Sequence, residues 1–474
     1  MSGKTFWVIA TLCAIVPLQA GAQSPNHGEA LANVLKGLAP VSALSNTTEG
    51  KVALTANYKV TGGIQTGTIQ QPTLLPFPQQ QQQALQDAFI TGGNFADLAD
   101  GLGTTLGDGY IARAHYVDQS HYTKLSQAVT DVIAYANGIT ASHSNAGKYL
   151  FGNATTDGKT PASAEEAAIL KDIHGETDIF GKSYGFPAGG PGAGAFGNAR
   201  PFQTEPGTVT IVGRDYLNLL SDNGQYNRGP KMNLVNSPSY PSGHTTYAYT
   251  GAVVLALLVP ERYQQMIARG AEYGNDRILM GAHYAMDVLG GRTLALYDLA
   301  HLLANDPSYT DQPVKGAPRI KDFQAAIKAA RADMTTALQA ACAKTMQECA
   351  REDTGRLNNP AANEAFYAVT QTYSLPVVFP QQANAQEDVG KVAHEAGYLL
   401  TIAFPTLTLD QANQILTETE GPGGGFLDNG SSFGVYSRLN LYAAAGKAVA
   451  LASALPSSAK RDTSSSPEAN ASHN

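Results

Sequence analysis

The chain has 474 residues, of which 43% are hydrophobic and 15% charged, and its 31 Lys and Arg against 39 Asp and Glu give a formal net charge of −8. This composition is typical of a globular protein and excludes a disordered acidic chain. The mild acidity argues against a nucleic-acid partner, because nucleic-acid binding normally requires a basic surface.

The first 22 residues have the three parts of a secretory signal peptide. Lys4 supplies a positive charge, residues 6–16 are apolar, and Ala20-Gly21-Ala22 is a small-x-small cleavage site. The apolar run is too short to span a bilayer, and no later run reaches about 18 apolar residues. We therefore expect a mature protein that is periplasmic or secreted, without stable membrane insertion.

Apolar residues at helical spacing predict a mainly α fold. The expected helices cover residues 79–100 with an interruption at Gly92-Gly93, 124–136, 163–173, 244–258, 262–304 with breaks at Gly281 or Gly290-Gly291, 319–351 as one helix or a pair, 410–418 and 435–455. Residues 183–200 are rich in Gly and Pro and predict a loop. Residues 208–212 (TVTIV) are the best short strand.

We expect five segments along the chain, with the bounds of the helical core implied by a family resemblance that residues 200–287 carry. They are the signal peptide (1–22), an N-terminal extension packing on the core (23–109), a helical core (110–305), a C-terminal helical extension (306–455) and a disordered tail (456–474). The tail is assigned from its polar, Ser-rich composition.

Removal of the signal peptide takes Cys13 with it and leaves Cys342 and Cys349. Two cysteines in an exported protein favour one disulfide. Seven residues on an unbroken helix rise about 10.5 Å, beyond the Cα separation of about 7 Å that a disulfide tolerates. Either the helix ends between the two residues or they stay reduced, and we favour a bridge across a helix end.

The segment Pro241-Ser242-Gly243-His244 precedes the most apolar predicted helix. Ser is a good N-cap, and Gly lets the backbone approach a ligand closely. A helix N-terminus binds anions through its free N–H groups, and His244 would add a proton donor there. Taken alone, the pattern is also compatible with a capped helix start and an incidental histidine.

A second pattern, Arg277-x5-His283-x3-Asp287, places His283 and Asp287 one helical turn apart. A carboxylate at that position can hold one imidazole nitrogen and leave the other as a base or nucleophile. Arg277 can converge on them through its length or through a bend at Gly281. The alternative is a surface arginine beside a structural His–Asp pair.

Arg200-Pro201 follows the Gly-rich loop and is uninformative alone, although Arg suits bidentate binding of an oxyanion. In order and coarse spacing, three segments together resemble the signature of the type 2 phosphatidic acid phosphatase superfamily: Arg200-Pro201, Pro241-Ser242-Gly243-His244 and Asp276-Arg277-x5-His283-x3-Asp287. That superfamily includes the bacterial class A nonspecific acid phosphatases, which the chain resembles most, and the vanadium-dependent haloperoxidases. The resemblance implies a helical bundle, here with long Gly/Pro-rich loops and extra C-terminal helices.

The chain departs from the family pattern at two positions. The family usually carries a lysine seven residues before the Arg of Arg-Pro, and here that position is Ala193. The nearest upstream lysine, Lys182, is therefore a candidate replacement. The third motif usually opens Ser-Arg and here opens Asp276-Arg277, where the added carboxylate would adjust the charge of the site or face solvent.

The resemblance implies an exported, metal-independent acid phosphatase that hydrolyses small phosphomonoesters through a phosphohistidine. The implied phosphate-binding residues are Arg200, Ser242, Gly243, Arg277 and Lys182. The implied catalytic residues are His283 as nucleophile, His244 as general acid and Asp287 as the residue that orients His283. No cofactor is expected for a phosphatase.

Two other functions remain open at this stage. A vanadium-dependent haloperoxidase would hold vanadate in the same cage, with His283 as its ligand, although Ala193 disfavours it. A non-catalytic oxyanion-binding protein would use the cage alone, although it would need neither His244 nor His283. The sequence leaves the natural substrate and the oligomeric state open.

Overall fold

The computed structural model describes residues 25–69, 73–89, 92–189, 196–205 and 209–454. These residues form a mainly helical fold, and their only sheet is a two-stranded antiparallel one, β1 (Val212–Arg214) paired with β2 (Leu220–Asp222). The predicted fold class is confirmed. No helix in the described part of the chain is both long and apolar enough to cross a membrane. The predicted signal peptide and the predicted tail lie outside the described residues.

The helices fall into three groups along the chain. Before the core come α1 (Pro25–Leu38), α2 (Thr48–Thr66), α3 (Phe77–Gln86) and α4 (Thr104–Ile111), with 3-10 helices at Ala39–Asn46 and Ala96–Leu102. The core contains α5 (Gln127–Leu150), α6 (Ala164–Asp172), α7 (Ile179–Ser183), α8 (Pro201–Thr204), α9 (Asn223–Asn227), α10 (Gly243–Leu258), α11 (Tyr263–Leu279) and α12 (Ala285–Leu303), with a 3-10 turn at Pro260–Arg262. After it come α13 (Pro307–Thr310), α14 (Phe323–Cys342), α15 (Met346–Arg351), α16 (Pro360–Thr370), α17 (Pro380–Ala383), α18 (Val389–Val392), α19 (Tyr398–Thr401), α20 (Leu409–Glu418), α21 (Ser432–Val435) and α22 (Leu441–Ala454), with 3-10 turns at Arg356–Asn358 and His394–Gly397.

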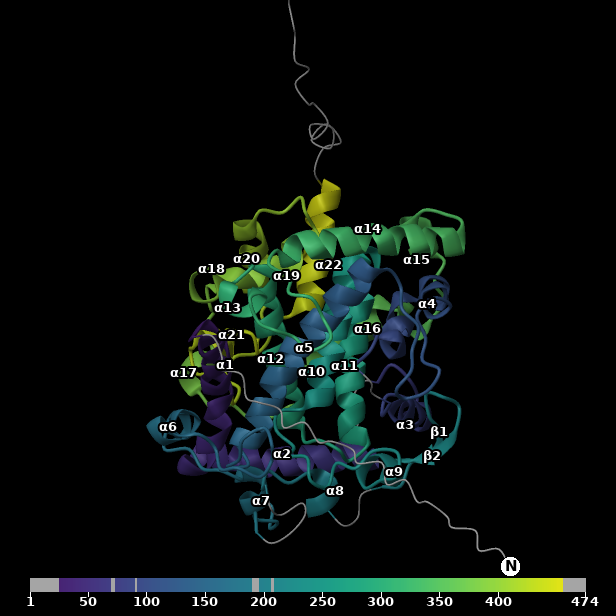
Figure 1. The fold of residues 1–474 in the computed structure, drawn as a ribbon. Coiled ribbons are helices and arrows are strands. Elements are labelled where there is room, and N and C mark those ends of the chain that lie inside the picture. Colours follow the sequence, from purple (N-terminus) through teal and green to yellow (C-terminus); the bar gives the residue numbers. More distant parts are fainter. Residues whose placement is uncertain (1–24, 70–72, 90–91, 190–195, 206–208, 455–474) are drawn as a thin grey trace, which may run out of the picture.

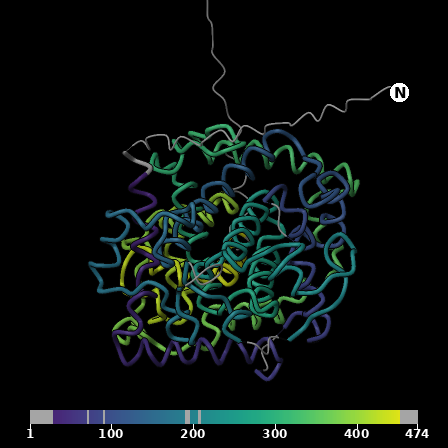
Figure 2. Tube along the Cα trace, turned by 60° about the horizontal axis from the view of Figure 1, so that its bottom comes forward, coloured from purple at the N-terminus to yellow at the C-terminus, as the bar shows by residue number. Residues whose placement is uncertain are grey.

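The long helices α5, α10, α11 and α12 form the central bundle, and α14 crosses one end of it (Figure 1). Every residue of α10 after Gly243 is buried, as expected for a helix that is apolar on all sides. The helices α10 and α11 approach closely at Gly270, where an added Cβ would lie 2.9 Å from the Cβ of Ala252. Figure 2 shows the bundle surrounded by segments from both the N-terminal and the C-terminal parts of the chain.

The predicted break at Gly281 is confirmed. The residue has a φ of 71°, which favours glycine, and it ends α11. The amides of Ala282 and His283 both donate to the carbonyl of Arg277, at 3.1 and 3.2 Å. This turn reverses the chain and brings the end of α11 beside the start of α12.

The alternative break at Gly290-Gly291 is wrong, because α12 continues through both residues. The two glycines serve close packing instead. A Cβ on Gly290 would lie 2.5 Å from the Tyr240 ring, and one on Gly291 would lie 2.4 Å from the carbonyl oxygen of Ser242. The absence of side chains there lets the segment that enters α10 lie directly against α12.

Helix α2, from the segment before the core, packs against the end of the bundle where α12 begins. Helix α2 runs across the lower end in Figure 1 and supplies caps to the start of α12. The Asn57 Oδ1 accepts from the Met286 amide at 3.0 Å, and the Thr61 Oγ1 accepts from the Ala285 amide at 3.2 Å. These bonds satisfy N–H groups that a helix start leaves without intrahelical partners.

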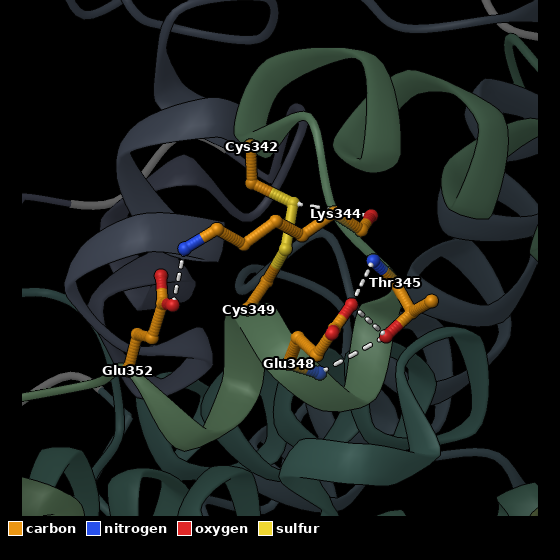
Figure 3. Close-up of a disulfide and its surroundings, with 6 residues drawn as sticks. All are labelled: Cys342, Lys344, Thr345, Glu348, Cys349 and Glu352. Carbon is orange, nitrogen blue, oxygen red and sulfur yellow. Dashed lines mark hydrogen bonds and ion pairs between the residues drawn. A yellow bond between two sulfur atoms is a disulfide. The ribbon is translucent and has the colours of Figure 1, made fainter.

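The cysteines form the expected bridge. Helix α14 ends at Cys342, and Ala343, which has a φ of 57°, turns the chain into α15, where Cys349 lies (Figure 3). Their Cα atoms are 6.3 Å apart, within the range of a disulfide. The prediction of a disulfide across a helix end is confirmed, and the predicted segment 319–351 is a pair of helices.

Candidate active site

The predicted motif residues meet at the lower end of the bundle. The start of α10, the turn between α11 and α12, and the start of α8 converge there, and the rings of His244 and His283 have their centroids 5.9 Å apart. The Phe202 amide donates to the Gly281 carbonyl at 3.0 Å, which fixes α8 to the turn. Segments far apart in the sequence therefore form one buried cluster.

Ser242 caps α10 as predicted. Its Oγ accepts from the Thr245 amide at 3.1 Å, and its own amide donates to the Asp287 carbonyl at 2.9 Å. Gly243 is the first residue of the helix, and a Cβ there would lie 2.8 Å from the Lys148 ammonium and 3.5 Å from the Ser144 hydroxyl. The missing side chain leaves room at a helix N-terminus, which favours an anion.

His283 and Asp287 form the predicted pair. The Nδ1 of His283 lies 3.3 Å from the Asp287 Oδ2, and its Nε2 lies 3.0 Å from the Arg200 Nη1. A guanidinium can only donate, so Nε2 must be the acceptor and Nδ1 must carry the proton. In this tautomer the Nε2 carries a lone pair, which points toward Arg200 and so into the cluster.

Asp287 is held by more than His283. Its Oδ2 accepts from the Tyr284 amide at 2.8 Å and from the Ser239 hydroxyl, which sequence analysis did not single out. Burial raises the pKa of Asp287 to about 7, while the bonds from Ser239 and Tyr284 oppose that rise. Positive charge on the His283 ring would favour the ionised carboxylate.

Arg200 is fully buried and its side chain is fixed by protein groups. It donates to the carbonyls of Ser237 at 2.6 Å, Pro238 at 3.1 Å and Ala282 at 2.9 Å. Burial lowers its pKa to about 10, so the guanidinium stays charged at neutral pH. Its orientation is therefore set before any ligand arrives.

Several buried hydrogen-bonding atoms around the cluster have no partner among the described residues. They are the Nε of Arg277, the Nε2 of His244, the hydroxyl of Ser144 and one acceptor, the Oδ1 of Asp287. The Nη2 of Arg277 donates to the Ala84 carbonyl at 2.9 Å, and its guanidinium lies over the Tyr273 ring. Unsatisfied buried donors are costly, so their convergence indicates a site built for an acceptor-rich ligand such as a tetrahedral oxyanion.

The structure brings a lysine to the cluster that sequence analysis missed. Lys148 lies near the end of α5, partly buried, one helical turn after Ser144, and its ammonium faces Gly243. Burial and the charge of Arg200 lower its pKa to about 7, while Asp287 raises it. No signal in the sequence pointed to it, because the helix predicted over 124–136 ends before Lys148, whereas α5 continues to Leu150.

Lys182 does not lie in the cluster, which corrects the expectation that it replaces the family lysine. Its ammonium is 3.5 Å from Glu176, and its side chain is 47% exposed. Lys182 lies in the last turn of the short helix α7. Ala193, the position of the family lysine, lies outside the described residues.

Asp276 does not face solvent, and its hydrogen bond is to α3 rather than to the cluster. Its side chain is fully buried, and its Oδ1 accepts from the Gln80 Nε2 of α3 at 2.6 Å. Burial, followed by the charges of Asp87 and Glu272, holds its pKa well above the ordinary value and so favours the protonated carboxyl. The carboxyl therefore joins the N-terminal segment to α11.

The two histidines share a positive environment. Burial, followed by the charge of Arg200, holds the pKa of His283 well below its ordinary value. Burial, followed by the charge of Arg277, does the same for His244. Both rings are therefore neutral before an anion binds, and a bound anion would raise both pKa values.

No group of three or more His, Cys, Asp or Glu in the described part of the chain is arranged to hold a metal ion. The charges that converge on the cluster are instead those of Arg200, Arg277 and Lys148. The donor set fits an oxyanion, vanadate as well as phosphate, because both present oxygen acceptors to these groups.

Comparison with known proteins agrees with this geometry. The family model of the PAP2 superfamily matches residues 194–304. The chain is 45% identical over 64 residues to a non-specific acid phosphatase of Salmonella typhi, covering 14% of this chain and 26% of that protein. It is 42% identical over 64 residues to an acid phosphatase of Zymomonas mobilis, covering 14% and 24%.

A more distant similarity, 32% identity over 80 residues, joins it to a lipid A 1-phosphatase of Rhizobium etli, over 17% of this chain and 34% of that protein. The matches thus span about a quarter to a third of the curated relatives. Residues 194–304, which the PAP2 superfamily model matches, contain all three predicted motifs.

Proposed function

We propose that this protein is a phosphatase that hydrolyses phosphomonoesters through a phosphohistidine on His283. The observation that carries the proposal is the tautomer of His283. Its Nε2 lone pair faces the cluster, while Nδ1 is held toward Asp287. A nucleophile oriented by a third group is the arrangement that covalent catalysis requires.

The phosphoryl group would bind among the converging donors. Arg277 supplies its unpaired Nε, Gly243 the amide of a helix start, and Lys148 an ammonium. Arg200 supplies positive charge, because its N–H groups already donate to protein acceptors. These groups would stabilise the charge on the equatorial oxygens in the transition state. The role proposed for Lys148 takes the place of the one first expected for Lys182.

The proposed reaction uses two histidines, one as nucleophile and one for proton transfer. The Nε2 of His283 attacks phosphorus, and the bond from phosphorus to the ester oxygen breaks. His244 gives a proton to the departing alkoxide and then takes one from the water that releases phosphate from His283. The charge of the bound phosphoryl group opposes the burial and the cations that lower the pKa of His244, so binding of the ester favours the protonated ring.

Hydrolysis of p-nitrophenyl phosphate by the mature chain, in the presence of EDTA, tests the proposal. We expect turnover that persists in EDTA and that orthovanadate inhibits, since vanadate mimics the transition state. Bromide oxidation that requires vanadate and peroxide, without phosphatase activity, would instead assign a haloperoxidase. Phosphate binding with neither activity would assign a binding protein.

The proposal includes an exported location, on the basis of residues 1–22 and of the disulfide, because disulfides persist mainly outside the cytoplasm. Fractionation of the native host would test it. We expect the activity in the periplasm or medium, in a form that begins after residue 22. Activity confined to the cytoplasm, with residues 1–22 retained, would contradict it.

A further inference from the structure

A further buried arginine lies on α12, outside the candidate active site. Arg292 is 1% exposed, and its guanidinium donates to the carbonyls of Thr370 at 3.4 Å, Gln371 at 3.3 Å and Ser437. Its Nε has no hydrogen-bond partner, and no carboxylate of the described residues lies within 4.0 Å of its nitrogens. A buried cation without a counter-charge is costly, so this position calls for an explanation.

Arg292 lines a cavity of about 110 Å³ between α12 and the C-terminal segments around residues 371–377 and 422–427. Most of the cavity walls are apolar, and they come both from α12 and from the C-terminal segments. They include Met286, Leu289, Leu375, Pro376, Phe426 and Leu427. The cavity is similar in size to an engineered one of about 150 Å³ that binds benzene.

A second unpaired donor lines the same cavity. The Nε2 of Gln371 is buried without a hydrogen-bond partner, and the residue is only 5% exposed. Buried donors are normally satisfied, so two of them on one cavity indicate a missing acceptor. Because one donor is a guanidinium, the acceptor that suits it best is an anion.

The acids near the cavity already have a partner of their own. Arg438 lies 3.0 Å from Glu420, 3.8 Å from Asp428 and 3.9 Å from Glu387. These carboxylates face that guanidinium rather than Arg292. None of these carboxylates pairs with Arg292, so a bound anion would supply the counter-charge that it lacks.

We propose that this cavity binds a small carboxylate with a compact apolar body. The carboxylate would accept from the Nε of Arg292 and the Nε2 of Gln371, and the body would fill the apolar walls. Inorganic phosphate is a poor match, because it would leave those walls unfilled. The site is separate from the His283 cluster and does not depend on the proposed phosphatase activity.

Titration calorimetry of the mature chain with benzoate tests the proposal, with orthovanadate present to occupy the His283 cluster. We expect one benzoate bound per chain. Benzamide, which has the same shape without the charge, should bind at least about tenfold more weakly, a difference of about 1.4 kcal/mol. Equal binding of the two compounds, or no benzoate binding at millimolar concentration, would overturn the proposal.

Two variants test whether benzoate binds in this cavity without disturbing the fold. Gln371→Leu removes an unsatisfied donor, and Gly425→Val fills space, because a Cβ at Gly425 meets nothing within 4 Å and its φ is not in the left-handed region. We expect each to weaken benzoate binding at least about tenfold and to leave the melting temperature unchanged. Gly28→Val, at an exposed glycine with equal space, is the matched control. Unchanged benzoate affinity in both cavity variants would refute the assignment.

Discussion

Arg269 and Arg277 lie eight residues apart on α11, both buried, yet their surroundings differ in charge. Arg269 donates to both oxygens of Asp87 at 2.6 Å and to Asp100 at 2.7 Å. Arg277 has no carboxylate within 4.0 Å among the described residues, and its Nε has no partner. One arginine is satisfied by the protein, and the other is held ready for a ligand.

Helix α11 therefore contributes Arg269 to a structural cluster and Arg277 to the candidate active site. Around Arg269, Glu272 and Arg356 extend the pairing, with 2.6 Å between the Arg356 Nη2 and the Glu272 Oε2. Around Arg277, the neighbours are cations and neutral histidines. Burial alone therefore says little about function, whereas burial without a counter-charge points to a ligand.

The largest effect should come from His283→Ala. Loss of the nucleophile should lower kcat for p-nitrophenyl phosphate by at least about 10³-fold, while circular dichroism and the melting temperature change little. His301→Ala is the matched control, because His301 also pairs with a carboxylate, Asp306 at 2.9 Å, outside the cluster. Near-normal kcat in His283→Ala would remove the basis of the proposed mechanism.

Paired substitutions on α11 should separate activity from stability. Arg277→Met should lower kcat/KM by about 10²-fold and leave the free energy of unfolding nearly unchanged, because it removes an unpaired charge. Arg269→Met should lower the free energy of unfolding by about 3–5 kcal/mol, because it leaves buried carboxylates unpaired. Denaturant unfolding and steady-state kinetics measure both. The opposite pattern, or equal effects in both variants, would contradict the comparison.

Lys148 should make kcat/KM depend on pH. Because its pKa is about 7, the ammonium is charged below that pH and neutral above it. The kcat/KM for an anionic ester should therefore fall as the pH rises through about 7. Lys148→Arg should move this fall to higher pH, and Lys148→Met should lower kcat/KM about tenfold at pH 5–6.

Lys182→Met is the control for Lys148, because Lys182 lies outside the cluster. It should leave the pH profile unchanged. If Lys148→Arg leaves the fall where it is, the fall belongs to another group, such as His244, and the assignment of Lys148 is wrong.

The smallest effect should come from Asp276→Asn. Because the pKa of Asp276 is raised in the folded state, the wild type loses part of its stability as the pH rises above the ordinary carboxyl pKa. Asn keeps the shape and is always neutral. The variant should be more stable than the wild type by about 1 kcal/mol at pH 7 and lose this advantage near pH 4. Equal stability at both pH values would show that the carboxyl is not protonated.

The sequence predicted those parts of the site that lie in short segments with helical spacing. Ser242, His244, His283 and Asp287 belong to helix starts, where local geometry fixes which side chains share a face. The bend at Gly281 was also foreseen, because a left-handed turn favours glycine.

The parts that could not be predicted depend on tertiary packing. Lys148 enters from α5, far before the motifs in the chain, and nothing local distinguishes it from a surface lysine at a helix end. Gly290 and Gly291 have the composition of a helix break, but here they allow Tyr240 and Ser242 to pack against α12. Such choices become visible only when the opposing segment is known.

The most direct test of the central claim is to trap the covalent intermediate. Mature protein is mixed with excess p-nitrophenyl phosphate in EDTA, quenched in alkali to preserve phosphohistidine, digested and analysed by mass spectrometry. The account predicts a phosphoryl group on the peptide that contains His283, and none in His283→Ala. Full turnover in the wild type without any phosphoryl group on His283 would contradict it.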